Sequence, residues 1–333
     1  MKITVCIPLY NGEHCVESAL KSLELQTRKP DEVIIRDDCS SDNWKEIISR
    51  FTGLNINLFT NEVNLGLTNN WNKCLEDSNG DIVTFLHQDD GFEPKFLEQV
   101  EKDFETNSNS VGMWTCGSSL EGIPFKTSVE DSGIQEGQKS IEEIFTWEGI
   151  PAPPGVSFRR SALLEVGFYD PEFKCTAYVD LYFRLISKGY LIYKSEKNLV
   201  WRTLPETRAT TMYGDSNLLY NEWLYFLEKY SIDNKLVSNN LIVRALSNFY
   251  YRASFSVAIN IFRSRRYGEA LGIIKTIHSR GKDFEKLQGL KSMSRLRFLF
   301  LIFKRSLKLL YFFLRRRAAL IYRALNRNKK AYN

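Results

Sequence analysis

The chain has 333 residues, of which 43% are hydrophobic and 13% aromatic, so it can fill a sizeable core and is neither disordered nor fibrous. The net charge of +5 is unevenly spread, because residues 290–333 hold 13 of the 45 basic side chains and none of the 40 acidic ones. The remaining 289 residues therefore carry 32 basic against 40 acidic side chains. An acidic main body argues against nucleic acid as a partner.

The six cysteines are scattered along the chain, with no C-x-x-C pair and no histidine at metal-ligand spacing. This pattern argues against a zinc site and against a disulfide framework. The N-terminal segment MKITVCIPLYNG also lacks the character of a secretion signal. We therefore expect a protein of the reducing cytoplasm.

The first ninety residues alternate strand-like and helix-like segments. We predict strands at 3–9, 32–36, 56–60 and 82–86, and helices at 13–26, at 44–48 behind an N-cap at Ser41-Asp42, and at 68–76. This order predicts a parallel sheet with right-handed crossovers and helices on both faces. Beyond residue 111 we expect short strands and a helix at 178–188, and beyond about residue 215 only helices.

Three parts are therefore expected, namely an α/β domain at 1–215, a helical domain at 216–289 and a basic helical tail at 290–333. The tail has no apolar run near 18 residues and is a poor transmembrane helix. On a helical wheel Arg297, Lys304, Lys308 and Arg315 share one stripe, which is typical of an amphipathic helix lying on an anionic membrane. The alternative is a helix packed on the acidic domain of its own chain.

Polar side chains follow each of the four predicted parallel strands, and ligands of such sheets bind at the carboxyl ends of the strands. The groups are Tyr10-Asn11-Gly12, Asp37-Asp38, residues 61–64, and Gln88-Asp89-Asp90. Asp89 and Asp90 either cap the next helix or share a divalent cation and a sugar hydroxyl. Asp38 either belongs to a simple turn or accepts a hydrogen bond from the imide N–H of a pyrimidine.

Four blocks resemble, in order and spacing, the family 2 glycosyltransferases with the GT-A fold. They are CIPLYNGEHCVESALKSLELQT, EVIIRDDCSSD, NLGLTNNWNKCLEDSNGDIVTFLHQDD and PPGVSFRRSALLEVGFYDPEF, and the resemblance covers roughly residues 1–205. It implies a Rossmann-like sheet and transfer, with inversion, of a sugar from a nucleotide-sugar donor to a hydroxyl. We expect a UDP-linked donor and a lipid-linked glycan acceptor, with the protein peripheral on the cytoplasmic face of the membrane.

The resemblance also implies roles for the residues that match the family blocks. Asp90 would bind Mn²⁺ or Mg²⁺, which neutralises the departing diphosphate. The donor side would comprise Pro8, Tyr10 and Glu13 around the nucleotide, Asp38 at the base, Asp89 at the ribose with Gln88 beside it, and Asn64, Gly66 and Asn72 near the diphosphate. His87 is expected to have a structural or donor-shaping role rather than to bind metal.

The chain departs from the family pattern at two places. The acidic pair expected before the D-L-x-x-R-L segment is Ala177-Tyr178 here, and the late histidine is replaced by Leu204. Asp180 is the nearest acid and is the predicted general base, unless it only favours the dipole of its helix, and Asp170 ranks second.

The alternative is a non-catalytic relative of these enzymes that binds either a nucleotide sugar or a membrane partner. Dehydrogenase and P-loop functions are poorly supported, because the chain contains neither a G-x-G-x-x-G nor a Walker A segment. A sugar nucleotidyltransferase would need a Gly-rich, Arg-bearing N-terminal loop, which residues 8–12 are not.

Overall fold

We describe a computed structural model of the chain. It describes residues 1–107, 109–120, 132–148, 153–202 and 216–231, and of the following segment residues 236–238, 240–242, 244–246, 248–249 and 252. The chain divides into two compact units, one of Met1–Ile144 with Glu148–Gly214, the other of Phe145–Trp147 with Asp215–Asn333. The predicted tail at 290–333, Leu204, and most of the predicted helical domain lie outside the described residues.

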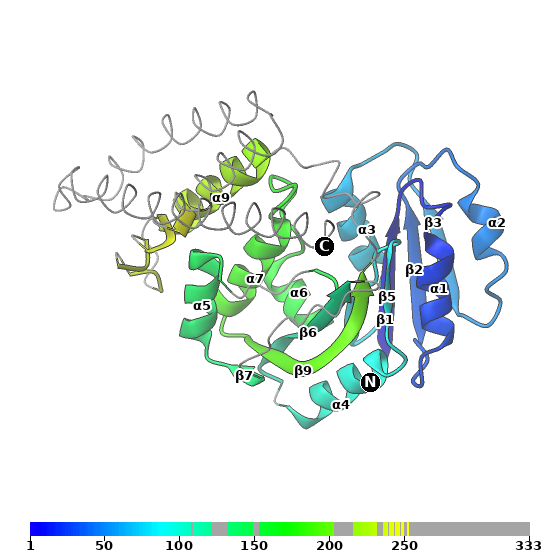
Figure 1. The fold of residues 1–333 in the computed structure, drawn as a ribbon, viewed down its shortest axis with the longest axis horizontal. Coiled ribbons are helices and arrows are strands. Elements are labelled where there is room, and N and C mark those ends of the chain that lie inside the picture. Colours follow the sequence, from blue (N-terminus) through cyan, green and yellow to red (C-terminus); the bar gives the residue numbers. More distant parts are fainter. Residues whose placement is uncertain are drawn as a thin grey trace, which may run out of the picture. The chain divides into compact units, whose positions relative to one another are not determined.

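A nine-stranded sheet forms the first unit, in the order β3-β2-β1-β4-β8-β6-β9-β5 with β7 beside β9 (Figure 1). The strands are β1 (Ile3–Leu9), β2 (Glu32–Asp37), β3 (Ile56–Thr60), β4 (Ile82–Phe85), β5 (Asp90–Phe92), β6 (Val111–Leu120), β7 (Gly133–Gln135), β8 (Val156–Arg159) and β9 (Leu191–Arg202). Strands β3, β2, β1 and β4 are parallel, which confirms the predicted half-sheet. Strands β8 and β5 add antiparallel pairs with β4 and β9.

Helices cover both faces of the parallel strands, as predicted. The helices are α1 (Val16–Glu24), α2 (Trp44–Ile48), α3 (Leu67–Asp77), α4 (Phe96–Thr106), α5 (Gly137–Thr146), α6 (Arg160–Val166) and α7 (Ala177–Ser187). Figure 1 shows α1 and α3 on opposite sides of β1 and β2. Alternate residues of β1 such as Val5 and Ile7 join the buried cluster with α1, α2 and α4, whereas Cys6 points to α3, where its thiol contacts the Cys74 carbonyl at 3.5 Å.

Two predicted helix starts are wrong, for reasons of hydrogen bonding. Helix α1 begins at Val16 rather than at residue 13, because the Gly12 carbonyl first accepts from the N–H groups of Cys15 and Val16 in a turn. Helix α2 has Asn43, not Ser41-Asp42, at its N-cap. Asp42 instead accepts the Glu13 N–H at 2.7 Å, a long-range contact that local sequence does not reveal.

The second unit is described mainly through α9 (Ser216–Ser231). Trp223 of this helix stacks on Trp147 with ring centroids 4.7 Å apart, and Phe226 lies 5.3 Å from Phe145. Aromatic pairs of this kind contribute beyond the apolar area they bury. Within the described residues, none of the helices combines the length and apolar character that spanning a membrane requires.

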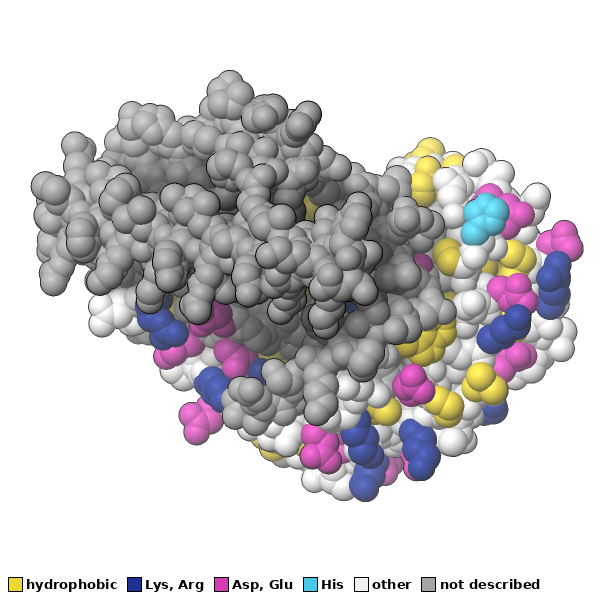
Figure 2. Space-filling model, in the orientation of Figure 1, with side chains coloured by type: hydrophobic (Ala, Val, Ile, Leu, Met, Phe, Trp, Pro, Cys, Tyr) yellow, Lys and Arg dark blue, Asp and Glu magenta, His cyan; other side chains and the backbone are white. Residues whose placement is uncertain are grey.

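Figure 2 shows one face of the molecule with its side chains coloured by type. On the described part of this face, basic and acidic side chains are interspersed rather than gathered by sign.

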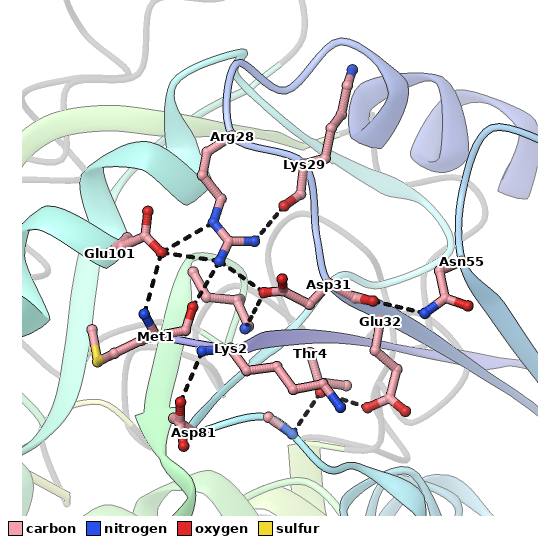
Figure 3. A network of polar contacts seen from close by, with 12 residues as sticks. Met1, Lys2, Thr4, Arg28, Lys29, Asp31, Glu32, Asn55, Asp81 and Glu101 are labelled. Carbon is pink, nitrogen blue, oxygen red and sulfur yellow. Dashed lines mark hydrogen bonds and ion pairs between the residues drawn. The ribbon is translucent and has the colours of Figure 1, made fainter.

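A polar network anchors the N-terminal end of β1, at the edge of the sheet opposite the carboxyl ends of the parallel strands (Figure 3). Arg28 Nη2 lies 2.7 Å from Asp31 Oδ2 and 2.9 Å from Glu101 Oε1, and donates to the Met1 carbonyl at 2.7 Å. Asp31 Oδ2 also accepts the Ile3 N–H at 2.7 Å. Burial acts to raise the pKa of Asp31, but the bonds from Ile3 and Arg28 outweigh it and hold that pKa below its usual value.

Replacement of Arg28 by Met should therefore lower the free energy of unfolding by roughly 2 kcal/mol, because it leaves two partly buried carboxylates and a carbonyl without their donor. Urea unfolding at neutral pH measures this loss. The matched control is Arg50→Met. Arg50 pairs with Glu46 on the exposed surface, so this change should alter stability by less than about 0.5 kcal/mol.

The same variant should alter the dependence of stability on pH. A carboxylate with a lowered pKa stabilises the fold above its unfolded pKa, and that stabilisation is lost as pH falls through the folded pKa. Because Arg28→Met removes one cause of the lowered pKa of Asp31, acidification should destabilise the variant less steeply than the wild type. If the free energy of unfolding falls equally steeply with acidification in the two proteins, Arg28 does not set the pKa of Asp31.

Candidate active site

The loops after β1 and β4 are joined by one side chain. Gln88 Oε1 accepts the Tyr10 N–H at 2.8 Å, and Gln88 Nε2 donates to the Tyr10 carbonyl at 3.1 Å. A Cβ at Gly12 would lie 2.9 Å from Gln88 Oε1, so this close approach requires glycine. The Tyr10 side chain is left 41% exposed at the carboxyl edge of the sheet. Pro8 lies within β1, opposite Arg36 of β2, and is buried.

The loops after β1 and β2 contain residues in the left-handed region of backbone conformation. Asn11 has φ of 47° and Cys39 has φ of 62°, values that cost about 1 kcal/mol or more for residues other than glycine. The strained loops hold each other, since Asn11 N–H donates to Ser40 Oγ at 2.8 Å and Asn11 Oδ1 accepts the Ser41 N–H at 3.1 Å. Strain of this kind is retained where surrounding contacts fix a particular surface.

Two hydrogen bonds that involve Glu13, Asp42 and Asn43 also join these two loops. The Glu13 N–H donates to Asp42 Oδ2 at 2.7 Å, and Glu13 Oε2 accepts the Asn43 N–H at 3.2 Å. The structure thus uses Glu13, predicted to border the nucleotide, to join the starts of α1 and α2. The other carboxylate oxygen of Asp42 is buried and has no hydrogen-bond partner within the described residues.

Asp38 is 3% exposed and holds the loop between β3 and α3. Its Oδ1 accepts the Leu65 N–H at 2.7 Å and Asn61 Nδ2 at 2.9 Å, and its Oδ2 accepts the Gly66 N–H at 2.9 Å. Three of about four lone-pair sites of the carboxylate are thereby used, which leaves one for a ligand. Gly66 has φ of 81°, a backbone conformation that favours glycine, and Asn64 Oδ1 accepts the same Gly66 N–H at 3.1 Å.

A buried network that the sequence interpretation missed supports Asp38. Asn61 Oδ1 accepts from Arg36 Nε at 2.8 Å, while its Nδ2 also donates to Asn70 Oδ1 at 2.9 Å. Arg36 Nη1 pairs with Asp77 at 3.0 Å. The sequence did contain a signal for this network. Arg36 is a charged residue that directly follows the apolar run 33–35 of its strand, and a buried charge needs partners.

Helix α3 connects the loop after β3 to a group of aromatic side chains. Asn72 clamps the backbone of Tyr169, with its Oδ1 accepting the N–H at 2.9 Å and its Nδ2 donating to the carbonyl at 2.8 Å. Trp71 meets the Tyr169 ring edge-on at 5.0 Å and stacks on His87 at 5.4 Å. Asn72, predicted near the diphosphate, therefore fixes the segment that follows α6.

The paired aspartates lie where β4 ends and β5 begins. Asp90 is buried, opens β5 opposite Arg202 of β9, and lies with Oδ2 3.4 Å from His87 Nδ1. Asp89 is half-buried beside it. Burial, followed by the charges of Asp89, Asp42 and Asp90, raises the pKa of the Cys15 thiol to about 12. The shift indicates that these carboxylates share one electronegative region at the start of α1.

These residues fit a divalent cation that is shared with a diphosphate. Such ions take one or two protein ligands and complete their coordination with phosphate oxygens and water. Asp90 supplies a buried carboxylate, and Nε2 of the adjacent His87 is buried without a hydrogen-bond partner in the described part of the chain. The described residues contain no cluster of three His, Cys, Asp or Glu side chains able to hold a metal by themselves, so a phosphate ligand would be needed.

The structure places Asp180, the predicted base, inside the protein rather than at the site surface. It is 0% exposed in the first turn of α7, and its Oδ2 accepts from Arg184 Nε at 2.7 Å. Arg184 in turn donates to the carbonyls of Val166, Gly167 and Phe168. Asp170, ranked second, is half-buried, and its Oδ1 accepts the Glu172 N–H at 2.9 Å. The base assignment stays a prediction.

Residues 4–167 match the family model described as Glycosyl transferase family 2. The chain is 28% identical over 234 residues to a Campylobacter jejuni protein named GalNAc(5)-diNAcBac-PP-undecaprenol beta-1,3-glucosyltransferase, covering 68% of this chain and 72% of the relative.

Two solved structures share the fold. One is S. aureus TarS 1-349 in complex with UDP-GlcNAc, with a TM-score of 0.62, 19% identity, and coverage of 92% of this chain and 88% of that one. The other is the mannosyltransferase PcManGT from Pyrobaculum calidifontis in complex with GDP-Man and Mn²⁺, with a TM-score of 0.55, 14% identity, and coverage of 85% and 87%. At these identities the likeness establishes the GT-A-type architecture, which confirms the predicted fold class.

Asp180→Asn tests whether Asp180 is structural or is the base. Because the change leaves the Arg184 guanidinium without its carboxylate, we expect a loss of about 3 kcal/mol in the free energy of unfolding, measured by urea denaturation. The matched control is Asp170→Asn, which keeps an acceptor for the Glu172 N–H and should stay within about 0.5 kcal/mol of the wild type. Unchanged stability in Asp180→Asn together with lost turnover would instead identify Asp180 as the base.

Proposed function

From the premise that this chain belongs to glycosyltransferase family 2, we propose that it moves a sugar, with inversion, from a UDP-linked donor to a hydroxyl of a lipid-linked glycan. One observation carries the proposal. Three loops at the carboxyl edge of the parallel strands bring Tyr10, the Asp38 carboxylate and the Asp89-Asp90 pair to the same end of the sheet. This edge is where open α/β sheets bind nucleotides.

Each side chain has a role that follows from its chemistry. The exposed Tyr10 ring offers a face for the base, and the remaining lone pair of Asp38 is suited to accept an imide N–H of uracil. Asp89 would accept a hydrogen bond from a ribose hydroxyl. Asp90 would hold Mn²⁺ or Mg²⁺, and such an ion stabilises negative charge on the departing diphosphate by several kcal/mol.

The acceptor hydroxyl must lose its proton as it attacks, and a positioned base accelerates such a step by about 10² to 10⁴-fold. Of the two predicted acids, Asp170 has exposed surface and follows Tyr169, which packs on Trp71 beside His87. Asp180 would have to leave the Arg184 guanidinium first. We therefore place Asp170 ahead of Asp180 as the candidate base.

The acceptor class is supported by relatives rather than by a described pocket. The Campylobacter jejuni relative is named for a glycan carried on PP-undecaprenol. An acceptor of this class lies at a membrane, and the basic tail at 290–333 has the composition of a helix that binds anionic lipid. We accordingly propose a peripheral protein on the cytoplasmic face, working in surface glycan assembly.

A non-catalytic donor-binding protein is the second candidate. It is favoured by Ala177-Tyr178 at the place of the family's acidic pair and by Leu204 at the place of the late histidine. The two candidates differ in turnover rather than in donor binding.

Incubation with Mn²⁺, a panel of nucleotide sugars and a lipid-linked acceptor should release nucleoside diphosphate, which a coupled assay measures. Asp90→Asn should slow this release by at least about 100-fold, because the leaving group loses its charge partner. Glu105→Gln, a change at the opposite edge of the sheet, should have no effect. Donor binding without turnover in the wild type, over varied acceptors, would establish the non-catalytic alternative.

Cys39 provides a second test that needs no acceptor. It is the exposed thiol directly after Asp38, whereas Cys6 and Cys74 are buried and the raised pKa of Cys15 suppresses its thiolate. Iodoacetamide should label Cys39 first, and saturating UDP should slow that labelling at least fivefold, as followed by peptide mass spectrometry. Cys39→Ser supplies the blank, and an unchanged labelling rate with UDP would place the nucleotide elsewhere.

A further inference from the structure

The separation of His87 and Asp90 is unusual for a hydrogen bond. Nδ1 and Oδ2 lie 3.4 Å apart, whereas N–H···O bonds centre near about 2.9 Å. Two ligands at neighbouring positions around one cation, each with a bond of about 2.1 Å, lie roughly 3 Å apart. The separation is compatible with both side chains binding one cation.

Both side chains are held in place by the surrounding structure. The Asp90 N–H donates to the His87 carbonyl at 3.1 Å, so one tight turn presents the two groups, and Asp90 is further fixed by pairing of β5 with β9. The His87 ring stacks on Trp71 with an interplanar angle of 21°. Trp71 is itself 6% exposed and is braced by the Tyr169 ring. A pair with so little freedom is preorganised for binding.

The second nitrogen of His87 is consistent with this arrangement. Nε2 is buried and makes no hydrogen bond within the described residues. If Nδ1 binds a cation, the imidazole is the tautomer whose proton is carried by Nε2. A purely structural histidine in this position would be expected to have a hydrogen bond at Nε2 already.

We propose that His87 is the second protein ligand of a divalent cation whose first ligand is Asp90, and that its imidazole makes the site select Mn²⁺ over Mg²⁺. The inference rests on the proposed function, since donor diphosphate must complete the coordination. Mg²⁺ prefers oxygen ligands, whereas imidazole nitrogen suits transition metals. Because the described residues provide no third ligand of this kind, Mn²⁺ affinity should rise when UDP is present.

The test is a titration of the full chain with MnCl₂, with and without UDP, in which electron paramagnetic resonance measures free Mn²⁺. His87→Gln should weaken Mn²⁺ binding in the presence of UDP at least tenfold and change Mg²⁺ binding less than about twofold. The matched control is His14→Gln, an exposed histidine on the turn before α1, which should bind both ions like the wild type. Far-ultraviolet circular dichroism checks that each variant is folded.

Pulsed electron paramagnetic resonance of the wild-type complex with Mn²⁺ and UDP detects a coordinated nitrogen directly. This measurement does not depend on whether a variant folds. Wild type and His14→Gln should show modulation from a coordinated nitrogen, and His87→Gln should not. Absence of this signal in the wild type, or equal Mn²⁺ affinity in His87→Gln, overturns the proposal. So does a loss of metal-free UDP binding in His87→Gln, since that marks a role in shaping the pocket.

The proposed function would fail in a different way. If the wild type shows the nitrogen signal with Mn²⁺ alone and UDP neither binds nor raises Mn²⁺ affinity, the His87 ligand stands and the nucleotide-sugar function falls. If UDP binds and Mn²⁺ follows it without a nitrogen signal, the function stands and the His87 ligand falls.

Discussion

The buried charge of Asp38 is the constraint on which the candidate site depends. A carboxylate at 3% exposure is tolerated only if donors replace its water, and here an amide side chain and two backbone N–H groups do so. Two of those donors belong to Leu65 and Gly66, directly before α3. The need to satisfy one charge therefore sets where α3 begins, and α3 carries Trp71 to the side of His87.

Many polar side chains at this edge of the sheet form hydrogen bonds within the protein itself. Loops without regular ladders leave backbone groups that side chains must satisfy, and Glu13, Gln88 and Asn72 do this for the loops around the site. The result is a rigid rim, which is what precise placement of a donor requires.

The structure shows the surroundings of the residues at one departure from the family pattern. Tyr178, at the place of an expected acid, is half-buried, and desolvation first, then Cys175, raises the pKa of its phenol to about 12. A phenol of that pKa remains protonated at neutral pH and is a poor substitute for a carboxylate base. The neighbouring Asp180 is committed to Arg184, whose guanidinium ties down the segment at 166–168.

The sequence by itself determined the parallel half-sheet, its helices on both faces and the end of the sheet at which the polar loops lie. These follow from apolar periodicity and from the order of strands and helices, which are local properties of the chain. Only the tertiary structure decided how each polar residue is used. The partners of Asp38 and Asp42, and the strand pairing that seats Asp90 opposite Arg202, join segments distant in sequence. A hydrogen bond depends on distance and direction in space, and side-chain type alone fixes neither.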